Sequence, residues 1–322
     1  MTKPVAVHPL VSPWGRFGLY SFFIDAPEPA IVDTGIASSP AEGMAPALAA
    51  IGRRIEDVRW ILLTHGHIDH IGGAYALWEL TGRRARVVIH EADAPLLRSR
   101  RAHVDEYLAG RGQYLHDPDG EAKLTAATNA VISGELEPDL LMRGGETISL
   151  GGDVTISVHS IPGHTPGSVA YVLDGQNDVF VGDTVQVHGA ANGFPGFVDP
   201  AGYRSSLQYL SEEIRPRHLY LGHPYRRADG TPYGVELDAG QAREALQGSL
   251  AIEARVREAA CSCLADGLQE TNSPYSPFAL AAAELGYESD PTLEPSPFFT
   301  TLHGYRTASD QTKENEEINT HG

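Results

Sequence analysis

Short apolar runs and amphipathic segments alternate along the first part of the chain. Strand-like apolar runs lie at residues 5–11, 19–26, 29–35, 58–65 and 85–93. Segments with the apolar spacing of helices lie at residues 40–52 and 69–82, and they end at Gly52 and Gly82. Because strands and helices alternate, we expect an α/β fold in which helices are layered against sheet.

Residues 95–143 interrupt this alternation. They contain helical fragments, the turn sequence HDPDG and few strand-like runs, so we interpret them as a helical insertion. Beyond them, strands are predicted at 152–163, 167–175, 177–183 and 218–223, and a helix at 203–214.

The C-terminal part is helical and then rich in proline. A long helix is predicted at 238–267, with Asp238 as its N-cap, and a short one at 277–287. We therefore divide the chain into a core (1–235, including the insertion), a C-terminal helix and Pro-rich arm (236–308), and a disordered tail (309–322). The aromatic residues of the arm need burial across a cleft, against the core, or in a homodimer. We expect truncation near Gly267 to leave a folded core.

Composition and charge narrow the class of protein. The chain has 322 residues, of which 42% are hydrophobic, and no apolar run approaches the roughly 20 residues of a membrane-spanning helix. The N-terminus shows no secretory signal pattern. Cys261 and Cys263 are expected to be reduced, which predicts a cytoplasmic protein. The net charge of −18 opposes nucleic-acid binding, so we expect a small-molecule substrate.

The chemistry is concentrated in residues 62–73, which read LLTHGHIDHIGG. His65 and His67 lie two positions apart at a strand end, so both side chains point to one side. Asp69 and His70 follow in the first turn of a helix. Four ligand-type side chains can therefore converge on one small volume.

Three further ligand-type residues follow predicted strands, namely His164, Asp183 and His223. Strand ends on one side of a sheet are where sites gather in layered α/β folds. Together, five histidines and two aspartates can bind two metal ions that share one carboxylate. Nitrogen and oxygen donors without thiolate suit Zn(II) and also allow Mn, Fe or Co.

Four motifs, in the order THGHIDH, PGHTPGS, GDT and LGH, resemble the metallo-β-lactamase superfamily, and most closely its glyoxalase II-like hydrolases. The resemblance covers about residues 5–225. It implies a four-layer αββα sandwich, with two mixed sheets face to face and helices outside. It also implies a ligand set, which is His65, His67 and His164 for one metal ion, Asp69, His70 and His223 for the other, and Asp183 for both.

The activity that this resemblance implies is hydrolysis of a small ester, lactone or thioester by a hydroxide that bridges two divalent metal ions. Asp69 would be the catalytic residue, orienting the hydroxide and passing a proton to the leaving group. Asp33 matches a strand-end aspartate that braces the metal loop, and a simple turn-forming role explains it equally well.

Departures from particular branches narrow the choice. His67 stands where flavo-diiron oxygen reductases need an acidic residue, which argues against that branch. β-Lactamases of the H-x-H-x-D-H type generally lack a carboxylate at the position of Asp183, so hydrolysis of β-lactams is also disfavoured. Gln186 stands where acyl-homoserine-lactone lactonases carry a tyrosine, which weakens that assignment and still leaves lactones open as substrates. A mononuclear iron sulfur dioxygenase of the same fold stays the alternative. A binding module without metal is disfavoured because all seven ligand positions are filled.

Aromatic residues in loops near the predicted site are candidates for substrate contact. The candidates are Phe17, Phe194, Tyr203 and Tyr225, with Trp14 and Phe197 in the same loops. Ordinary packing explains each of them equally well. Arg226 and Arg227 could meet a carboxylate or phosphate, or form a solvated basic pair.

Overall fold

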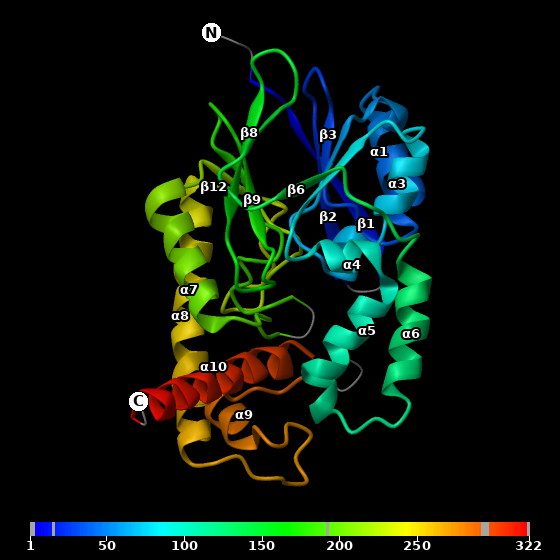
Figure 1. The fold of residues 1–322 in the computed structure, drawn as a ribbon. Coiled ribbons are helices and arrows are strands. Elements are labelled where there is room, and N and C mark those ends of the chain that lie inside the picture. Colours follow the sequence, from blue (N-terminus) through cyan, green and yellow to red (C-terminus); the bar gives the residue numbers. More distant parts are fainter. Residues whose placement is uncertain (1–3, 15–16, 191–192, 291–295, 321–322) are drawn as a thin grey trace.

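Two six-stranded sheets face each other in the computed structural model, with helices on their outer faces (Figure 1). The structure describes residues 4–14, 17–190, 193–290 and 296–320. This arrangement confirms the predicted αββα sandwich. None of the helices in the described residues has the length and apolar character needed to cross a membrane.

Sheet A is formed by the first part of the chain, and its strands follow sequence order. They are β1 (Val7–Trp14), β2 (Phe17–Ile24), β3 (Ala30–Val32), β4 (Trp60–Leu62), β5 (Arg86–His90) and β6 (Leu140–Met142). The pairs β1–β2 and β2–β3 are antiparallel, whereas β3–β4, β4–β5 and β5–β6 are parallel. The carboxyl ends of β3, β4 and β5 therefore meet at one edge.

Sheet B is formed by the next part of the chain, also in sequence order. Its strands are β7 (Thr147–Ser149), β8 (Thr155–Ser160), β9 (Val169–Leu173), β10 (Asp178–Phe180), β11 (His218–Tyr220) and β12 (Glu236–Asp238). Only the β10–β11 pair is parallel among these strands. Because β12 belongs to sheet B, the sheet continues past the expected core boundary at residue 235.

Three apolar clusters hold the four layers together. Residues that alternate along a strand face opposite sides, so Phe22 packs between the two sheets while Phe23 packs under the helices of sheet A. Likewise, Tyr171 lies between the sheets and Val172 lies under the helices of sheet B. Each sheet is therefore buried on both faces, as a four-layer fold requires.

Short helices cover sheet A. They are η1 (Pro40–Met44), α1 (Ala45–Ala50), η2 (Ile55–Asp57), α2 (Ile68–Ile71) and α3 (Ala74–Leu80). The helix predicted at 69–82 is thus divided in two at Gly72 and Gly73. A Cβ on Gly73 would collide with the backbone oxygen of Thr34, so the close approach at this division requires glycine.

The predicted insertion is helical over most of its length. It comprises α4 (Ala94–Arg98), α5 (Arg100–Ala109), η3 (Arg111–Tyr114) and α6 (Gly120–Val131). The expected boundary at residue 143 is corrected, because β6 falls inside it and pairs with β5. A three-residue strand is too short to give a periodic sequence pattern.

The remaining helices of the described residues lie beyond position 199, some in the core and some in the C-terminal part. They are α7 (Pro200–Tyr209), η4 (Leu210–Ile214), α8 (Ala239–Ala265), α9 (Ala279–Leu285) and α10 (Ser296–Thr320). Asp238 caps α8 as predicted, and Gln241 completes a capping box. The tail predicted to be disordered from residue 309 is helical to Thr320, consistent with the high helix propensity of Glu, Lys and Gln.

The arm after Gly267 packs into the core of sheet B. Phe278, Phe298 and Phe299 are fully buried in the same cluster as Leu219 of β11. The aromatic groups that suggested a homodimer are therefore covered within this chain.

Candidate metal centre

Sheet A supplies four of the predicted ligands from one loop and the helix that follows it. The loop leaves β4 and carries His65 and His67, and α2 carries Asp69 and His70. His67 is the extended residue at the N-terminus of α2, which turns the chain between the two pairs. The end of β4 and the start of α2 therefore bring all four side chains together.

Sheet B supplies the other three. His164 lies in the loop after β8, Asp183 in the loop after β10, and His223 in the loop after β11. Because β10 and β11 run parallel, Asp183 and His223 emerge at the same edge. The two sheets thus contribute to one centre from opposite sides.

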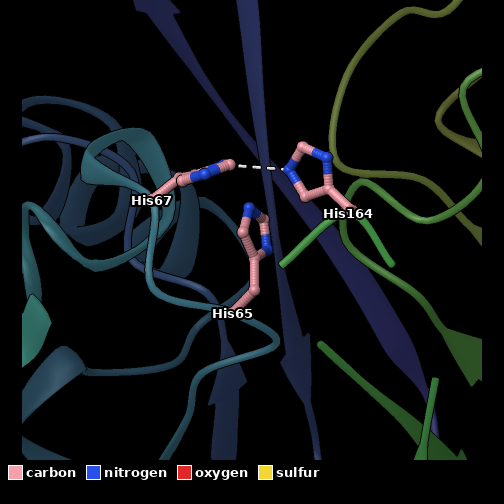
Figure 2. Close-up of side chains that lie close together, drawn as sticks. All are labelled: His65, His67 and His164. Carbon is pink, nitrogen blue, oxygen red and sulfur yellow. Dashed lines mark hydrogen bonds between the residues drawn. The ribbon is translucent and has the colours of Figure 1, made fainter. Parts of the chain in front are cut away.

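One ligand group consists of His65, His67 and His164 (Figure 2). His67 Nδ1 lies 2.8 Å from His164 Nε2. The ring of His65 lies edge-on to both, with centroid separations of 4.9 Å and 4.7 Å. The three imidazoles therefore surround one point.

A second group consists of Asp69, His70 and His223. His223 Nε2 lies 3.1 Å from Asp69 Oδ2 and 3.3 Å from His70 Nε2. Asp183 stands between the groups, with Oδ1 3.3 Å from His70 Nε2 and Oδ2 3.7 Å from His164 Nε2. One carboxylate thus reaches both.

These residues fit divalent metal ions. Ligand atoms around a tetrahedral zinc ion lie about 3.3 Å apart, given bonds of about 2.0–2.1 Å. The separations between Asp69, His70, His223 and Asp183 Oδ1 match this value. His65 Nε2 and Asp183 Oδ1 are buried without a hydrogen bond in the described structure, although buried polar atoms usually have a partner. A metal ion would satisfy both atoms.

The ligand rings are oriented by their other nitrogen. His70 Nδ1 lies 2.9 Å from Asp33 Oδ2, while His164 Nδ1 and His223 Nδ1 lie 2.6 Å and 2.8 Å from the carbonyl oxygens of Gly196 and Gly18. In each pair the imidazole N–H donates to the oxygen, which leaves Nε2 as a donor atom for metal.

Asp33 has both of the roles that its sequence position allows. Its backbone is left-handed, with φ of 58°, as in a turn. Its carboxylate accepts from the N–H of Thr64 at 2.8 Å and from His70, so it also braces the metal loop.

The histidines of the two groups differ in charge. Burial, together with neighbouring imidazoles, holds the pKa values of His65 and His67 well below their usual range. Burial also opposes charge on His70 and His223, but nearby carboxylates outweigh it. They raise the pKa of His70 well above its usual range and the pKa of His223 to about 10. In turn, these imidazoles outweigh burial and hold the pKa of Asp183 well below its usual range.

Two buried residues lie behind the candidate ligands and make contacts that the sequence did not predict. Asp93 accepts hydrogen bonds from both loops of the His65 group. Gln186 Nε2 donates to the carbonyl oxygens of Asp183 and Gly196 at 2.7 Å and 2.6 Å. Each is a single polar residue in a short segment, and only the folded structure reveals what it contacts.

Comparison with known proteins agrees with this geometry. A sequence profile described as the metallo-beta-lactamase superfamily matches residues 15–223, which include all seven candidate ligands. The chain belongs to the metallo-beta-lactamase superfamily. The predicted family is therefore confirmed.

Curated relatives in this superfamily include several hydroxyacylglutathione hydrolases. That of Rhodopseudomonas palustris (strain BisA53) is 33% identical over 65% of this chain and 66% of its own length. That of Acidiphilium cryptum (strain JF-5) is 31% identical over 78% and 76%. The chain spans only 59% of a second relative, from R. palustris strain BisB18.

Solved structures of superfamily members share the fold. A metallo-beta-lactamase family protein from Thermus thermophilus superimposes with a TM-score of 0.64 at 21% identity, covering 92% of both chains. An archaeal superfamily protein from Sulfolobus tokodaii gives a TM-score of 0.51 at 18% identity, covering 94% of this chain and 98% of that one.

A cavity of about 540 Å³ opens over the candidate metal ligands of this superfamily member. Its floor includes His67, Asp69 and Asp183. The insertion contributes one wall and the first turns of α10 contribute another. The wall residues not predicted from sequence include His103, Glu106, Arg111, Pro297, Thr300 and His303.

The predicted substrate residues separate into three groups. Phe194, Tyr225 and Trp14 line the cavity. Tyr203 is corrected: it is 1% exposed, does not line this cavity, and stacks on Phe197 with ring centroids 4.3 Å apart. Phe17 begins β2, but its side chain lies outside the described part of the structure.

The predicted basic pair also lies away from this cavity. Arg227 Nε lies 3.5 Å from Glu244, and its guanidinium covers the ring of Tyr233 at 3.9 Å. Arg226 forms a backbone bridge with Pro232. Neither arginine lines the cavity; Arg226 is exposed to solvent, whereas Arg227 is held by contacts within the protein.

Proposed function

We propose that this protein is a dinuclear metal-dependent hydrolase of a small ester, lactone or thioester, with Zn(II) as the metal. The observation that carries the proposal is the pair of ligand groups joined by Asp183, whose oxygens face His70 of one group and His164 of the other. All seven positions predicted to bind metal are occupied by suitable donors.

Two divalent ions bound there would polarise a substrate carbonyl and acidify a water molecule towards neutral pH. Asp69 lies at the cavity floor with Oδ2 beside His223, where its carboxylate can orient a nucleophilic water and receive a proton. Burial, together with the charge of Asp183, raises the pKa of Tyr225 well above its usual range. Its hydroxyl therefore stays protonated, and it faces Asp183 at the cavity.

The relatives favour a thioester as the first substrate to test. Their name specifies hydrolysis of a hydroxyacylglutathione, which is a thioester. The insertion and α10 form the cavity walls that lie away from the candidate metal ligands. These walls would therefore contact the acyl group and the leaving group of a substrate. Free Cys261 and Cys263 fit the predicted cytoplasmic location, where thiols stay reduced.

The alternative, a mononuclear iron sulfur dioxygenase, is less well supported. A mononuclear enzyme has no need of a complete second group, yet Asp69, His70 and His223 lie within mutual reach. The curated relatives named above are hydrolases. Elemental analysis separates the two functions, since about two zinc ions per chain are expected rather than one iron.

The decisive experiment is a hydrolysis screen with matched thioesters, lactones and aryl esters. We expect turnover of at least one class, loss of activity on chelation, and recovery on adding Zn(II). Asp183→Asn should lower metal content and turnover together, whereas exposed Asp153→Asn should change neither. Fully metal-loaded protein that hydrolyses no class would contradict the proposal.

A further inference from the structure

Asp93 lies between the two loops that carry the His65 group and is 1% exposed. It directly precedes α4, yet its carboxylate makes no capping hydrogen bond to that helix. Instead, Oδ2 accepts from the N–H of Gly66 at 2.7 Å and from the hydroxyl of Thr165 at 2.6 Å, and Oδ1 accepts from the N–H of Gly167 at 2.8 Å. Hydrogen bonds to an ionised acceptor are short and strong, so this carboxylate is a firm link.

The three donors belong to the loops that position the imidazoles. Gly66 separates His65 from His67, and Thr165 directly follows His164. The first loop leaves sheet A after β4, and the second leaves sheet B after β8. One carboxylate therefore joins ligand loops from two different sheets.

Both loops approach Asp93 at glycine. A Cβ on Gly167 would lie 2.5 Å from Asp93 Cγ. A Cβ on Gly66 would lie 3.1 Å from Asp93 Cβ and 2.6 Å from Leu96 Cδ1. A side chain at position 167 would collide with the carboxylate itself, and one at position 66 would crowd Asp93 and Leu96, so the close approach favours glycine at both positions.

Asp33 provides a useful contrast. It binds a ligand imidazole directly, at His70 Nδ1, and so acts on the second group. The hydrogen bonds of Asp93 go to backbone N–H groups and a hydroxyl and to no ligand side chain. Its influence on the centre must therefore act through the positions of the loops.

We infer that Asp93 is a positioning residue that fixes the spacing of the two loops and thereby sets the metal affinity of the His65–His67–His164 site, with no comparable effect on the Asp69–His70–His223 site. The inference rests on the proposed function only in that these residues bind metal. It requires no particular substrate.

The test measures Zn(II) affinity by competition with a chromophoric chelator, and the visible spectrum of the Co(II)-substituted protein. Asp93→Asn keeps the size of the side chain but turns one acceptor into a donor that faces N–H or O–H groups. Each site is isolated by a ligand variant, His223→Ala or His164→Ala. With the His65 group isolated, we expect Asp93→Asn to weaken binding about 10–100-fold and to alter the Co(II) spectrum.

Two controls make the result specific. When the Asp69–His70–His223 group is isolated, Asp93→Asn should change its Zn(II) affinity by less than about threefold. Asp33→Asn should weaken the Zn(II) affinity of this group. Asp178→Asn removes another buried carboxylate, bonded to His218 at 2.7 Å, and should change the affinity of neither site.

Equal loss at both sites, or no loss at the His65 group, would overturn the inference. If Asp93→Asn does not fold, Thr165→Val tests the inference instead. It removes one of the three hydrogen bonds to Asp93 and leaves the carboxylate in place. It should weaken the same site to a smaller degree, and unchanged affinity would refute the role of Asp93. Metal binding without hydrolysis would count against the proposed function alone.

Discussion

At the scale of single residues, the two ligand groups hold different numbers of protons before metal binds. His70 and His223 have raised pKa values, with that of His223 at about 10, so both are protonated at pH 7 in the metal-free protein. His65 and His67 have lowered pKa values and are neutral. Metal must displace protons from the second group and not from the first.

We therefore predict that acidification empties the Asp69–His70–His223 site first. Raised pKa values mean that protons compete with metal already at neutral pH, and the competition grows as the pH falls. Calorimetric titrations in buffers of different ionisation enthalpy should show proton release for one of the two zinc ions. Release of no protons, or equal release for both ions, would contradict this prediction.

Glu106 gives a second prediction at this scale. Its carboxyl lines the cavity without a hydrogen bond or ion pair to the described residues, and burial raises its pKa from 4.5, with Asp93 adding to the rise and Arg111 opposing it. The contribution of the Glu106 carboxyl to folding stability is therefore fully present below the pKa that it has in the unfolded chain. It is lost as the pH rises through the raised pKa of the folded state. Glu106→Gln should raise the melting temperature at pH 8 by roughly 1–3 °C.

The matched control is Glu258→Gln, at an exposed position of α8, which should leave the melting temperature unchanged at both pH values. At pH 4, Glu106→Gln and the wild type should melt together. A stabilisation that persists at pH 4 would mean that packing, and not the charge of Glu106, is responsible.

At the scale of elements, the insertion and α10 are joined across the cavity. The Tyr114 hydroxyl of η3 lies 2.8 Å from His303 Nδ1 of α10, and its ring stacks on Phe299 at a centroid distance of 5.5 Å. The hydrogen bond therefore fixes two walls that lie away from the metal ligands.

Tyr114→Phe should loosen these walls and leave the metal centre intact. A lost neutral hydrogen bond corresponds to about 0.5–1.5 kcal/mol, so we predict a KM raised roughly 3–10-fold with little change in kcat or metal content. Tyr209→Phe is the matched control, because that hydroxyl lies 2.8 Å from His159 on the outer surface. Unchanged KM in Tyr114→Phe, or lost metal, would contradict the prediction.

Elements also explain what could be predicted from sequence. The convergence of the candidate ligands was predictable because each follows a strand and four of them share one short motif. The strands β6 and β7 have three residues each, too few for a period to appear. The cavity walls and Asp93 depend on contacts between distant segments, such as Tyr114 with His303, which no local pattern contains.

At the scale of the whole molecule, the arm belongs to the core of sheet B. Phe278 and Phe298 are fully buried beside Val256 of α8. Truncation after Gly267 would expose this cluster, so we now predict loss of cooperative folding where the sequence alone suggested an independent core. Circular dichroism melts and dye binding to exposed apolar surface would test it, and a truncated chain with a sharp wild-type melt would contradict it.

The sequential order of strands has a consequence for synthesis. Sheet A uses residues 7–142 and sheet B uses residues 147–238, and within each sheet every strand pairs with its neighbours in the sequence. A chain leaving the ribosome can therefore assemble the first sheet before the second has been translated. Yet one ligand group needs His164 and the other needs His223. A nascent chain stalled before residue 164 would hold four of the seven candidate ligands and complete neither group. The proposed metal ions could therefore bind only once nearly all of both sheets has been made.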